Sequence, residues 1–366
     1  MILATSTARN LWGLKPWAVV LPLFAVAATF VGKPGSVPLA IACAVLLAGA
    51  IMAAVYHAEV LAHYLGEPFG TLTLALAVTI IEVSLIVSIM LGDGGGSQAL
   101  ARDTLMAAIM ITINGIVGIC LLAGGRIHHE QSYTQSGVSS GLAMLATLSV
   151  LVLILPNYTV SAPGAFYSDS QLMFVAVVSL AVYATFVLAQ TIRHRDHFLH
   201  QIEDADDHAH EAPVPRPKAL AAAGVLIVAL VAVVLLAKSL SPTIEASVAA
   251  MGAPQALVGI IIAGLVLAPE GFAALNAARA NRVQNSLNLA IGSALAAIGL
   301  TIPAVAAVAL VLDLDLELGL SMRSAVLLAL TLLVATITLS RGRTTIVQGV
   351  IHLVIFATWL FTTVVP

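Results

Sequence analysis

The chain has 366 residues, of which 60% are hydrophobic and only 9% are charged. Ordinary soluble domains carry about 25% charged residues, so this composition excludes a soluble globular protein. The net charge of −3 comes without any basic tract, which argues against nucleic acid as a partner. The apolar residues fall in runs near the ~20 residues that cross a bilayer as a helix. The sequence therefore predicts an all-α polytopic membrane protein whose immediate partner is the lipid bilayer.

Hydropathy over a window of about 19 residues predicts eleven membrane spans. The first, at 13–31, is followed by no clear cleavage site and is expected to be a retained helix. A glycine-rich break at 92–97 ends the third span. The other ten are predicted at 37–58, 69–91, 100–123, 138–160, 170–192, 218–238, 253–274, 285–312, 320–339 and 345–365.

The distribution of Lys and Arg predicts the orientation, because cytoplasmic loops are enriched in these residues. With the N-terminus inside, eleven of the fifteen lie on the cytoplasmic side. The opposite side has an acidic cluster at 313–317. We therefore expect a bacterial inner-membrane protein with a cytoplasmic N-terminus and its C-terminus on the opposite side. The eleven are Arg9, Lys15, Arg126, Arg193, Arg195, Arg216, Lys218, Arg279, Arg282, Arg341 and Arg343.

The spans divide into two halves around a long polar segment. If the first span is set aside, five precede this segment and five follow it. Because five is odd, two homologous halves must cross the membrane in opposite directions, which is the inverted repeat of many secondary transporters. The predicted divisions are an extra N-terminal helix at 1–35, a first five-helix repeat at 36–193, a linker at 194–218 and an inverted second repeat at 219–366.

Two acidic residues fall well inside apolar runs. Glu82 lies in the third span and Glu270 in the eighth, each the second span of its half. A charged side chain at this depth costs about 2.5 to 3.5 kcal/mol on the permissive insertion scales, so it is by default a functional candidate. Inverted symmetry would bring both carboxylates near the midplane. The alternative for each is a protonated glutamate bonded to a neighbouring helix.

The chemistry of two such carboxylates predicts cation/proton exchange. No Lys or Arg deep inside a span is available to neutralise them, because those that fall within the predicted bounds lie near span ends, so protons or a cation must occupy the site. Carboxylate oxygens are hard ligands that suit Ca²⁺ and similar ions, and they must lose their protons to bind a metal. The expected ligands are transported Ca²⁺, Na⁺ or K⁺ and H⁺, with no resident cofactor.

Other residues in the spans could support this site. Pro269 removes the backbone donor for the carbonyl of Leu265, which could then face a ligand, or it could only kink the helix. Four polar side chains either complete the coordination or form interhelical hydrogen bonds. These are Thr79, Asn114, Asn288 and Ser293.

The polar segment at 194–218 holds six of the eighteen acids and five of the ten histidines. It is either a solvated linker or a cytoplasmic cation funnel or sensor, because clusters of His and carboxylates bind divalent metals and titrate near neutral pH. Glu67, near the end of the second span, is either part of the cytoplasmic proton access or an interfacial side chain. The candidate regulatory residues are Glu67, Glu203, Asp204, Asp206, Asp207, His208 and His210.

The chain resembles the cation/proton exchangers of the Ca²⁺/cation antiporter superfamily, and among them the bacterial calcium/proton antiporters. The resemblance covers nearly the whole chain and rests on HYLGEPFG at 63–70, RDTL at 102–105, LAPEG at 267–271, and NLAIGS at 288–293 running to the Ile-Pro pair at 302–303. In that family each half carries a glutamate at the end of a G-N-x-x-E motif, and these positions match Glu82 and Glu270. The resemblance implies that both glutamates coordinate the cation in competition with protons.

The sequence departs from the family pattern beside both glutamates. Val78-Thr79 and Val266-Leu267 stand where the G-N pairs would, so the family's asparagine ligands are missing, and Ala296 replaces a frequent glutamine. Fewer neutral oxygen donors weaken the case for a Ca²⁺-selective cage. This departure leaves room for Na⁺ or K⁺ as the exported ion.

We therefore expect a secondary antiporter that exports Ca²⁺, or Na⁺ and K⁺, in exchange for protons by alternating access. One alternative is a Na⁺/K⁺ proton antiporter without Ca²⁺ selectivity. Another is a cation channel, although channels usually show a repeated filter element. An intramembrane enzyme would need a nucleophile and base, or a metal motif such as H-E-x-x-H, and the sequence has neither. The chain is thus not expected to be an enzyme.

Overall fold

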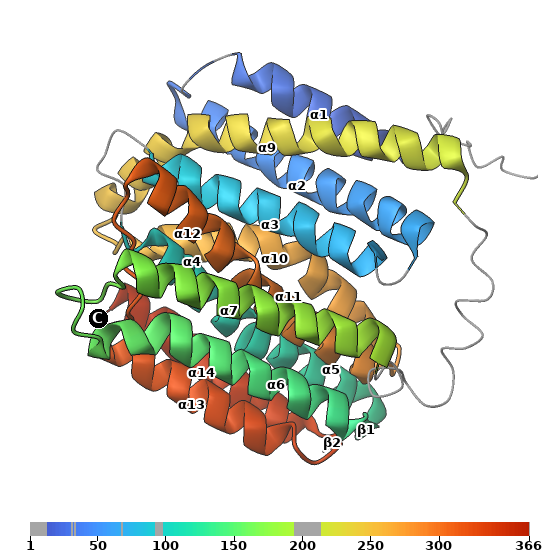
Figure 1. The fold of residues 1–366 in the computed structure, drawn as a ribbon. Coiled ribbons are helices and arrows are strands. Elements are labelled where there is room, and N and C mark those ends of the chain that lie inside the picture. Colours follow the sequence, from blue (N-terminus) through green and yellow to red (C-terminus); the bar gives the residue numbers. More distant parts are fainter. Residues whose placement is uncertain are drawn as a thin grey trace, which may run out of the picture. The chain divides into compact units, whose positions relative to one another are not determined.

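The computed structural model describes residues 13–365 apart from 31, 33, 67–68, 92–97 and 194–213. Most of this part of the chain is helical (Figure 1). In chain order the elements are α1 (Pro16–Thr29), α2 (Val37–Leu65), α3 (Phe69–Met90), α4 (Leu100–Ile109), η1 (Met110–Ile116), α5 (Val117–His128), β1 (Gln131–Ser132), α6 (Gln135–Ser149), η2 (Val150–Ile154), η3 (Leu155–Tyr158), α7 (Asp169–Leu188), η4 (Ala189–Arg193), α9 (Arg216–Ala250), α10 (Ala256–Arg279), α11 (Val283–Gly299), α12 (Thr301–Leu312), α13 (Met322–Thr338), β2 (Arg343–Thr344) and α14 (Ile346–Val364).

The eleven predicted helical segments are confirmed. Nine helical segments of the described chain are long and apolar enough to cross a membrane, and two shorter apolar helices, α1 and α13, complete the set. Several spans combine adjoining elements, as α4, η1 and α5 do over Leu100–His128. The predicted ends of α2 and α9 were too early. In α9 the helix continues through Lys238 and Pro242 to Ala250. The predicted span ends at 238 because the hydropathy falls there, although the backbone stays helical.

The described helices form two compact units, which we treat separately. The first comprises the described residues within Met1–Ser88 and Ala212–Ile244, and the second those within Ile89–Glu211 and Glu245–Pro366. Each unit draws helices from both predicted halves of the sequence. A compact unit reflects helix packing and not internal repetition, so the repeats at 36–193 and 219–366 and their inverted relation stay predictions.

In the first unit, α1 packs along α2. His57 in α2 places Nε2 3.0 Å from the carbonyl oxygen of Ala18 in α1, so a buried polar group joins the two helices. The hydroxyl of Ser239 in α9 donates to the carbonyl of Gly32 at 2.7 Å. The buried residues that join α1, α2 and the start of α9 are Leu14, Val19, Val60 and Ala222.

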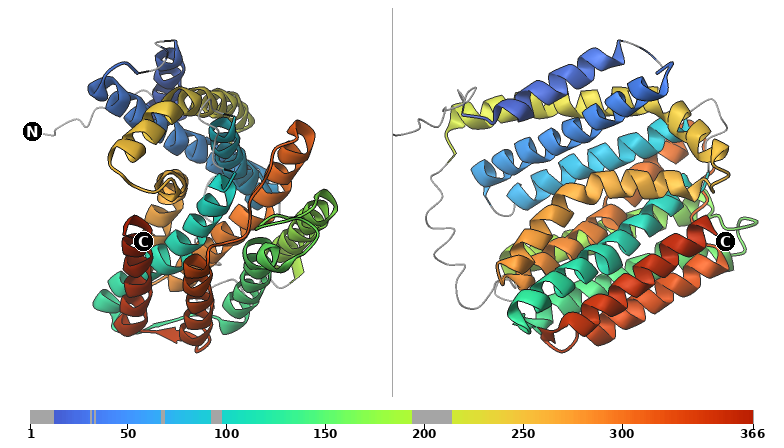
Figure 2. Two further views of the ribbon diagram at one scale, coloured as in Figure 1. Left: turned by 90° about the vertical axis from the view of Figure 1, so that its left-hand side faces the viewer. Right: turned by 180° about the vertical axis from the view of Figure 1, so that it is seen from behind.

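In the second unit, α10 packs against α4, α5 and α11, while α14 packs against α5 and η1. Figure 2 shows α14 running alongside α13. Glycines allow the closest crossings. A Cβ on Gly349 of α14 would lie 2.6 Å from the backbone nitrogen of Leu122 in α5, and one on Gly259 of α10 would lie 3.0 Å from that of Thr104 in α4. Small residues let membrane helices gain the packing contacts that hold them together in lipid.

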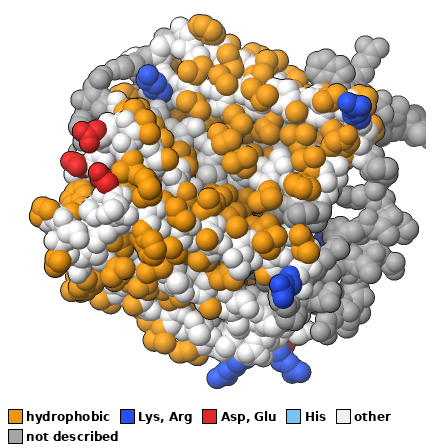
Figure 3. All heavy atoms as spheres, in the orientation of Figure 1, with side chains coloured by type: hydrophobic (Ala, Val, Ile, Leu, Met, Phe, Trp, Pro, Cys, Tyr) orange, Lys and Arg blue, Asp and Glu red, His pale blue; other side chains and the backbone are white. Residues whose placement is uncertain are grey.

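Apart from the buried Glu270, the charged residues of the second unit gather at its two ends. At one end Arg102 bonds to Glu317, and at the other β1 pairs with β2 and Arg343 Nη1 lies 3.1 Å from Glu130 Oε1. The surface over α6, α7 and α13 between these ends is largely hydrophobic, with acidic side chains near one end and Lys or Arg near the other (Figure 3). Eleven spans would place the loops of Arg102 and Glu317 on one side of the membrane and those of Glu130 and Arg343 on the other. In this unit, loops of the same predicted side therefore lie together.

We predict that Gly349→Ala destabilises the protein by about 1–3 kcal/mol, the usual cost of overpacking a tight contact. The new methyl group would meet the backbone of α5, at Leu122 N and at the carbonyl oxygen of Gly118 2.9 Å away, and backbone cannot rotate aside as a side chain can. Gly224→Ala is the matched control, since a Cβ there meets nothing within 4 Å. It should leave stability unchanged or raise it by up to about 1 kcal/mol. Thermal unfolding of the purified proteins in one detergent measures the difference, and equal stability of both variants would contradict the packing described.

Candidate functional site

Glu82 lies in the middle of α3, in the first unit, and only 5% of its surface is exposed. One turn earlier, Thr79 is buried and its hydroxyl donates to the carbonyl oxygen of Ala75 at 2.8 Å. This bond occupies the only proton of the hydroxyl, so the lone pairs of the Thr79 oxygen remain acceptors. The turn that carries Glu82 thus presents a carboxylate and a hydroxyl oxygen, both of which are hard donors suited to a cation.

Glu270 lies in α10, in the second unit, and is 9% exposed. Pro269 sits inside this helix, which continues without a break to Arg279. Because proline has no backbone N–H, the carbonyl of Leu265 cannot receive the usual bond from position 269. Gly271, on the other side of Glu270, lies close to η1: a Cβ there would be 3.3 Å from Ile116 Cδ1.

The two glutamates belong to different compact units. Both are buried and both lie within apolar helical segments. Their convergence on one site stays a prediction. Within the part of the chain that the structure describes, no three His, Cys, Asp or Glu side chains cluster as they would at a metal site built from these residues alone.

Asn114 lies in η1, a stretch of π-helix within the fourth span, and is fully buried. Its amide bonds to Thr331 of α13 and to His352 of α14. The sequence suggested either cation coordination or interhelical hydrogen bonding for this residue, and Asn114 does form interhelical hydrogen bonds. A direct contact between Asn114 and a cation stays a prediction.

Asn288 and Ser293 lie on α11, which packs against α10. Gln284 donates to Asn288 Oδ1 at 3.0 Å and accepts from the backbone N–H of Thr134 at 2.6 Å. Ser286 donates to the carbonyl oxygen of Ala274 at 2.6 Å and so bonds α11 to α10. The second unit thus packs the helices that carry Glu270, Asn114 and Asn288 against one another.

Several predicted residues lie outside the described part of the chain. They are the candidate access and regulatory residues Glu67, Glu203, Asp204, Asp206, Asp207, His208 and His210.

Sequence reasoning missed His352 and the cluster around Arg102. His352 is a lone histidine in the last apolar run, and a titratable side chain at membrane depth is itself a signal that would have identified it. Arg102 lies near the start of α4, where Nε is 2.9 Å from Asp103 Oδ1 and Nη1 bonds to both Glu317 and the carbonyl oxygen of Gly319. The partner at 317 is too far along the chain for any local pattern to indicate it.

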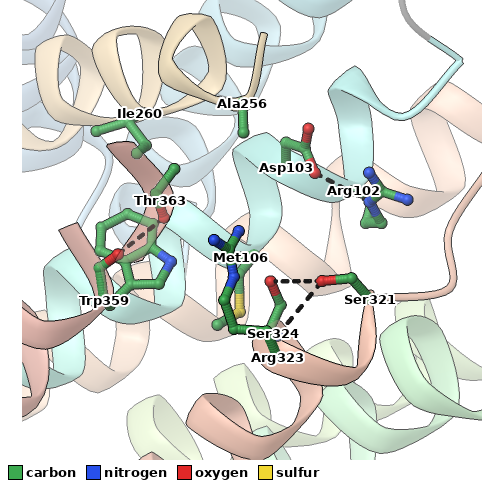
Figure 4. Close-up of a pocket in the computed structure, with 10 residues that line it drawn as sticks. All are labelled: Arg102, Asp103, Met106, Ala256, Ile260, Ser321, Arg323, Ser324, Trp359 and Thr363. Carbon is green, nitrogen blue, oxygen red and sulfur yellow. Dashed lines mark hydrogen bonds and ion pairs between the residues drawn. The ribbon is translucent and has the colours of Figure 1, made fainter. Parts of the chain in front are cut away.

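A cavity of about 220 Å³ opens beside this cluster (Figure 4). Its lining carries guanidinium, carboxylate and hydroxyl groups together with an indole ring. Ala256 and Ile260 of α10 line it, whereas Glu270 lies ten residues beyond Ile260, or about 15 Å along the helix. The cavity therefore belongs to the end of the second unit and not to the turn that carries Glu270. The lining residues are Arg102, Asp103, Met106, Ala256, Ile260, Ser321, Arg323, Ser324, Trp359 and Thr363.

The described part of the chain has eleven apolar helical segments, and two of them carry a buried carboxylate. Acidic side chains at membrane depth are typical of ion and proton pathways. The sequence profile of the sodium/calcium exchanger proteins matches residues 35–192 and 221–365. The chain belongs to the sodium/calcium exchanger family. It is thus a transporter of the cation-exchanger kind and not an enzyme.

Relatives and solved structures agree with this assignment. The putative ionic transporter y4hA of Sinorhizobium fredii is 46% identical over 96% of both chains. The sodium-potassium/proton antiporter ChaA of Escherichia coli is 37% identical over 95% of this chain and 96% of its own. The structure of native YfkE has a TM-score of 0.72 at 15% identity and covers 96% of this chain and 99% of its own. The H⁺/Ca²⁺ exchanger CAX has a TM-score of 0.70 at 17% identity, with 94% and 86% covered. At these identities the two structures show a shared fold.

We predict that Arg102→Gln lowers the free energy of unfolding by about 1–3 kcal/mol, since charge-assisted bonds to partly buried groups are among the stronger ones. Arg102 and Asp103 are each 16% exposed and Glu317 is 30% exposed, so the two acids would lose their counter-ion in a partly desolvated place.

Arg343→Gln is the matched control, because the pair of Arg343 and Glu130 is 74% and 50% exposed and such pairs contribute about 0–1 kcal/mol. Thermal unfolding at low and moderate salt compares the two variants. A loss at Arg343 as large as that at Arg102 would contradict this account.

Proposed function

We propose that this chain is a cation/proton antiporter that exports Ca²⁺, or Na⁺ and K⁺, in exchange for H⁺. Alternating access around one site carrying Glu82 and Glu270 is the proposed mechanism. The observation that carries the proposal is the burial of both carboxylates inside apolar spans of a cation exchanger. The match of the family profile to two stretches of the chain, one holding each glutamate, supports equivalent roles for them.

Protons and cations compete because both bind the ionised carboxylate. An unpaired carboxylate within the membrane is costly, so each glutamate holds a proton or shares a cation at every stage. A cation binds only after the protons leave, and its release allows the protons to return. The Thr79 hydroxyl and the carbonyl of Leu265 are the neutral oxygen atoms that we assign as supporting ligands.

The relatives point to both candidate ions. The Escherichia coli relative is named a sodium-potassium/proton antiporter, whereas the similar fold of CAX belongs to an H⁺/Ca²⁺ exchanger. Threonine and leucine at positions 79 and 267 provide fewer amide oxygens than a Ca²⁺ site usually uses. The second candidate function is therefore Na⁺/K⁺ proton exchange without Ca²⁺ selectivity.

We also propose a bacterial inner-membrane location with the N-terminus in the cytoplasm. The excess of Lys and Arg on the loops of one side supports it. The predicted linker at 194–218 would then face the cytoplasm, where a regulatory role for its acids and histidines stays a prediction.

Transport by the purified protein in vesicles tests the function directly. A pH gradient is imposed, and the movement of Ca²⁺, Na⁺ and K⁺ is followed separately together with internal pH. Proton movement that requires one of these cations and saturates with its concentration is the expected result. Cation flux that neither saturates nor moves protons would indicate a channel instead.

We predict that Glu82→Gln and Glu270→Gln each lower exchange by more than about 100-fold, since even groups that only support metal ligands cost about 10- to 100-fold when removed. Glutamine keeps the volume of the side chain but cannot alternate between a proton and a cation. Glu130→Gln is the matched control, because this glutamate is half exposed and pairs only with Arg343 in the described structure. Wild-type exchange in either buried variant would overturn the proposed site.

We further predict that exchange of Ca²⁺ is electrically neutral. If one Ca²⁺ replaces one proton on each of Glu82 and Glu270, the loaded site has the same charge in both states. Each uncompensated charge would be worth about 2.3 kcal/mol per 100 mV, a large effect on the end point. Uptake driven by a pH gradient should reach the same end point with and without a potassium potential clamped by valinomycin. A clear shift with voltage would mean that another proton takes part.

A further inference from the structure

Four buried polar side chains in the second unit, among them the candidate Asn114, form a hydrogen-bonded network. His352 of α14 places Nδ1 3.0 Å from Asn114 Oδ1 and Nε2 2.9 Å from Thr338 Oγ1. Asn114 Nδ2 lies 2.9 Å from Thr331 Oγ1. His352, Asn114 and Thr331 have no exposed surface. The network joins η1 to α13 and α14.

The donors and acceptors determine how the amide of Asn114 is oriented. The hydroxyl of Thr331 donates to the carbonyl oxygen of Leu327 at 2.8 Å, so its oxygen accepts the bond from the Asn114 amide nitrogen. The amide oxygen of Asn114 then faces His352 and can only accept, so Nδ1 of the ring carries a proton. His352 is thus a donor that holds Asn114 from the side of α14. Nε2 of the neutral ring is then an acceptor, and the Thr338 hydroxyl can donate to it in place of its bond to the carbonyl oxygen of Val334.

Asn114 lies where the fourth span is widened. At the end of η1 the backbone N–H of Val117 donates to the carbonyl of Thr112, five residues back instead of four. Such turns are rare and are frequent at functional sites. The side chain of Asn114, bonded on both sides, ties the widened turn to α13 and α14.

The same turn reaches the helix that carries Glu270. A Cβ built on Gly271 would lie 3.3 Å from Ile116 Cδ1 and 3.5 Å from Ile116 Cγ1, so the end of η1 packs against the residue next to Glu270. Packed interiors transmit a displacement, because there is little space to absorb it. A change in the shape of η1 therefore moves the turn of α10 around Glu270.

We propose that His352, acting through Asn114, is a positioning residue for Glu270. It holds η1 in its widened form and so sets where the Glu270 carboxylate stands. The inference rests on the proposed function in that it takes Glu270 to bind the transported cation. Removing the Nδ1 donor lets η1 relax and weakens cation binding at Glu270, whereas the Nε2 contact with Thr338 contributes little.

Three variants separate the two ring nitrogens. In His352→Asn the amide nitrogen stands near the place of Nδ1 and can still donate to Asn114. In His352→Gln the amide group reaches the place of Nε2 and leaves Asn114 without its donor. His352→Leu removes both contacts. The pair of amide variants differs by one methylene group, so each is the other's control for folding.

The readout is the reaction of Glu270 with dicyclohexylcarbodiimide in the full-length protein in nanodiscs, measured by peptide mass spectrometry. This reagent modifies protonated carboxyl groups in apolar surroundings, and a bound cation protects them. The concentration of Ca²⁺ or Na⁺ that halves the modification reports cation binding without transport. We expect His352→Gln and His352→Leu to raise this half-protecting concentration about tenfold, which is the scale of one hydrogen bond. In His352→Asn it should stay within about threefold of the wild-type value.

Saturation of flux in vesicles provides the second readout. The cation concentration at half-maximal rate should rise in His352→Gln more than the maximal rate falls, whereas general loss of folded protein lowers only the maximal rate. Asn114→Ala should raise the half-protecting concentration as His352→Leu does. The double variant should add little, since both substitutions remove the same bond between His352 and Asn114.

The outcomes separate this inference from the proposed function. If no cation protects Glu270 in the wild-type protein, the proposed function fails and the positioning role fails with it. If a cation protects Glu270 in the wild-type protein but the half-protecting concentrations of His352→Gln and His352→Asn are equal, only the positioning role is overturned. Protection of His352→Leu at the wild-type concentration would overturn it as well.

Discussion

The interior of a bilayer offers no water, so every polar group within a span must find its partner inside the protein. Many polar side chains of the described helices meet this constraint within a single helix. Hydroxyl groups such as those of Thr79 and Thr331 donate to a carbonyl one turn earlier in the same helix. Charged groups of the second unit are held at its two ends, as in the bonds of Arg102 to Asp103 and Glu317. The middle of each span is left apolar, with few and conspicuous exceptions.

Glu82 and Glu270 are the exceptions on which the proposed function rests. A bare carboxylate is costly at this depth, so protons or a cation are the proposed occupants of both side chains. In the proposed mechanism, the same desolvation that makes these residues costly suits them to exchange, because a proton and a cation would replace one another without leaving a bare charge. Membership of the sodium/calcium exchanger family places this chemistry in a transporter.

The network of His352, Asn114, Thr331 and Thr338 meets the same constraint in a second way. Its members satisfy one another across η1, α13 and α14 instead of within one helix. A network of this kind links helices that lipid by itself would not hold in register. It also connects the widened turn of η1 to the helix of Glu270 through the contact of Ile116 with Gly271. The widened turn of the fourth span and the position of Glu270 in the eighth are thereby parts of one packing arrangement.

The sequence by itself determined the eleven helical segments, the two intramembrane glutamates and the family, because hydropathy and short motifs depend only on neighbouring residues. It did not determine the widening of the fourth span at Met110–Ile116, the partners of Asn114, or the bond of Arg102 to Glu317, whose residues are 215 positions apart. Nor did it place the end of α9, where a helix continues past Lys238 and Pro242. These features depend on which helices pack together, and contacts between distant segments are decided by tertiary structure, since the donors and acceptors that satisfy a buried group need not be near it in the chain.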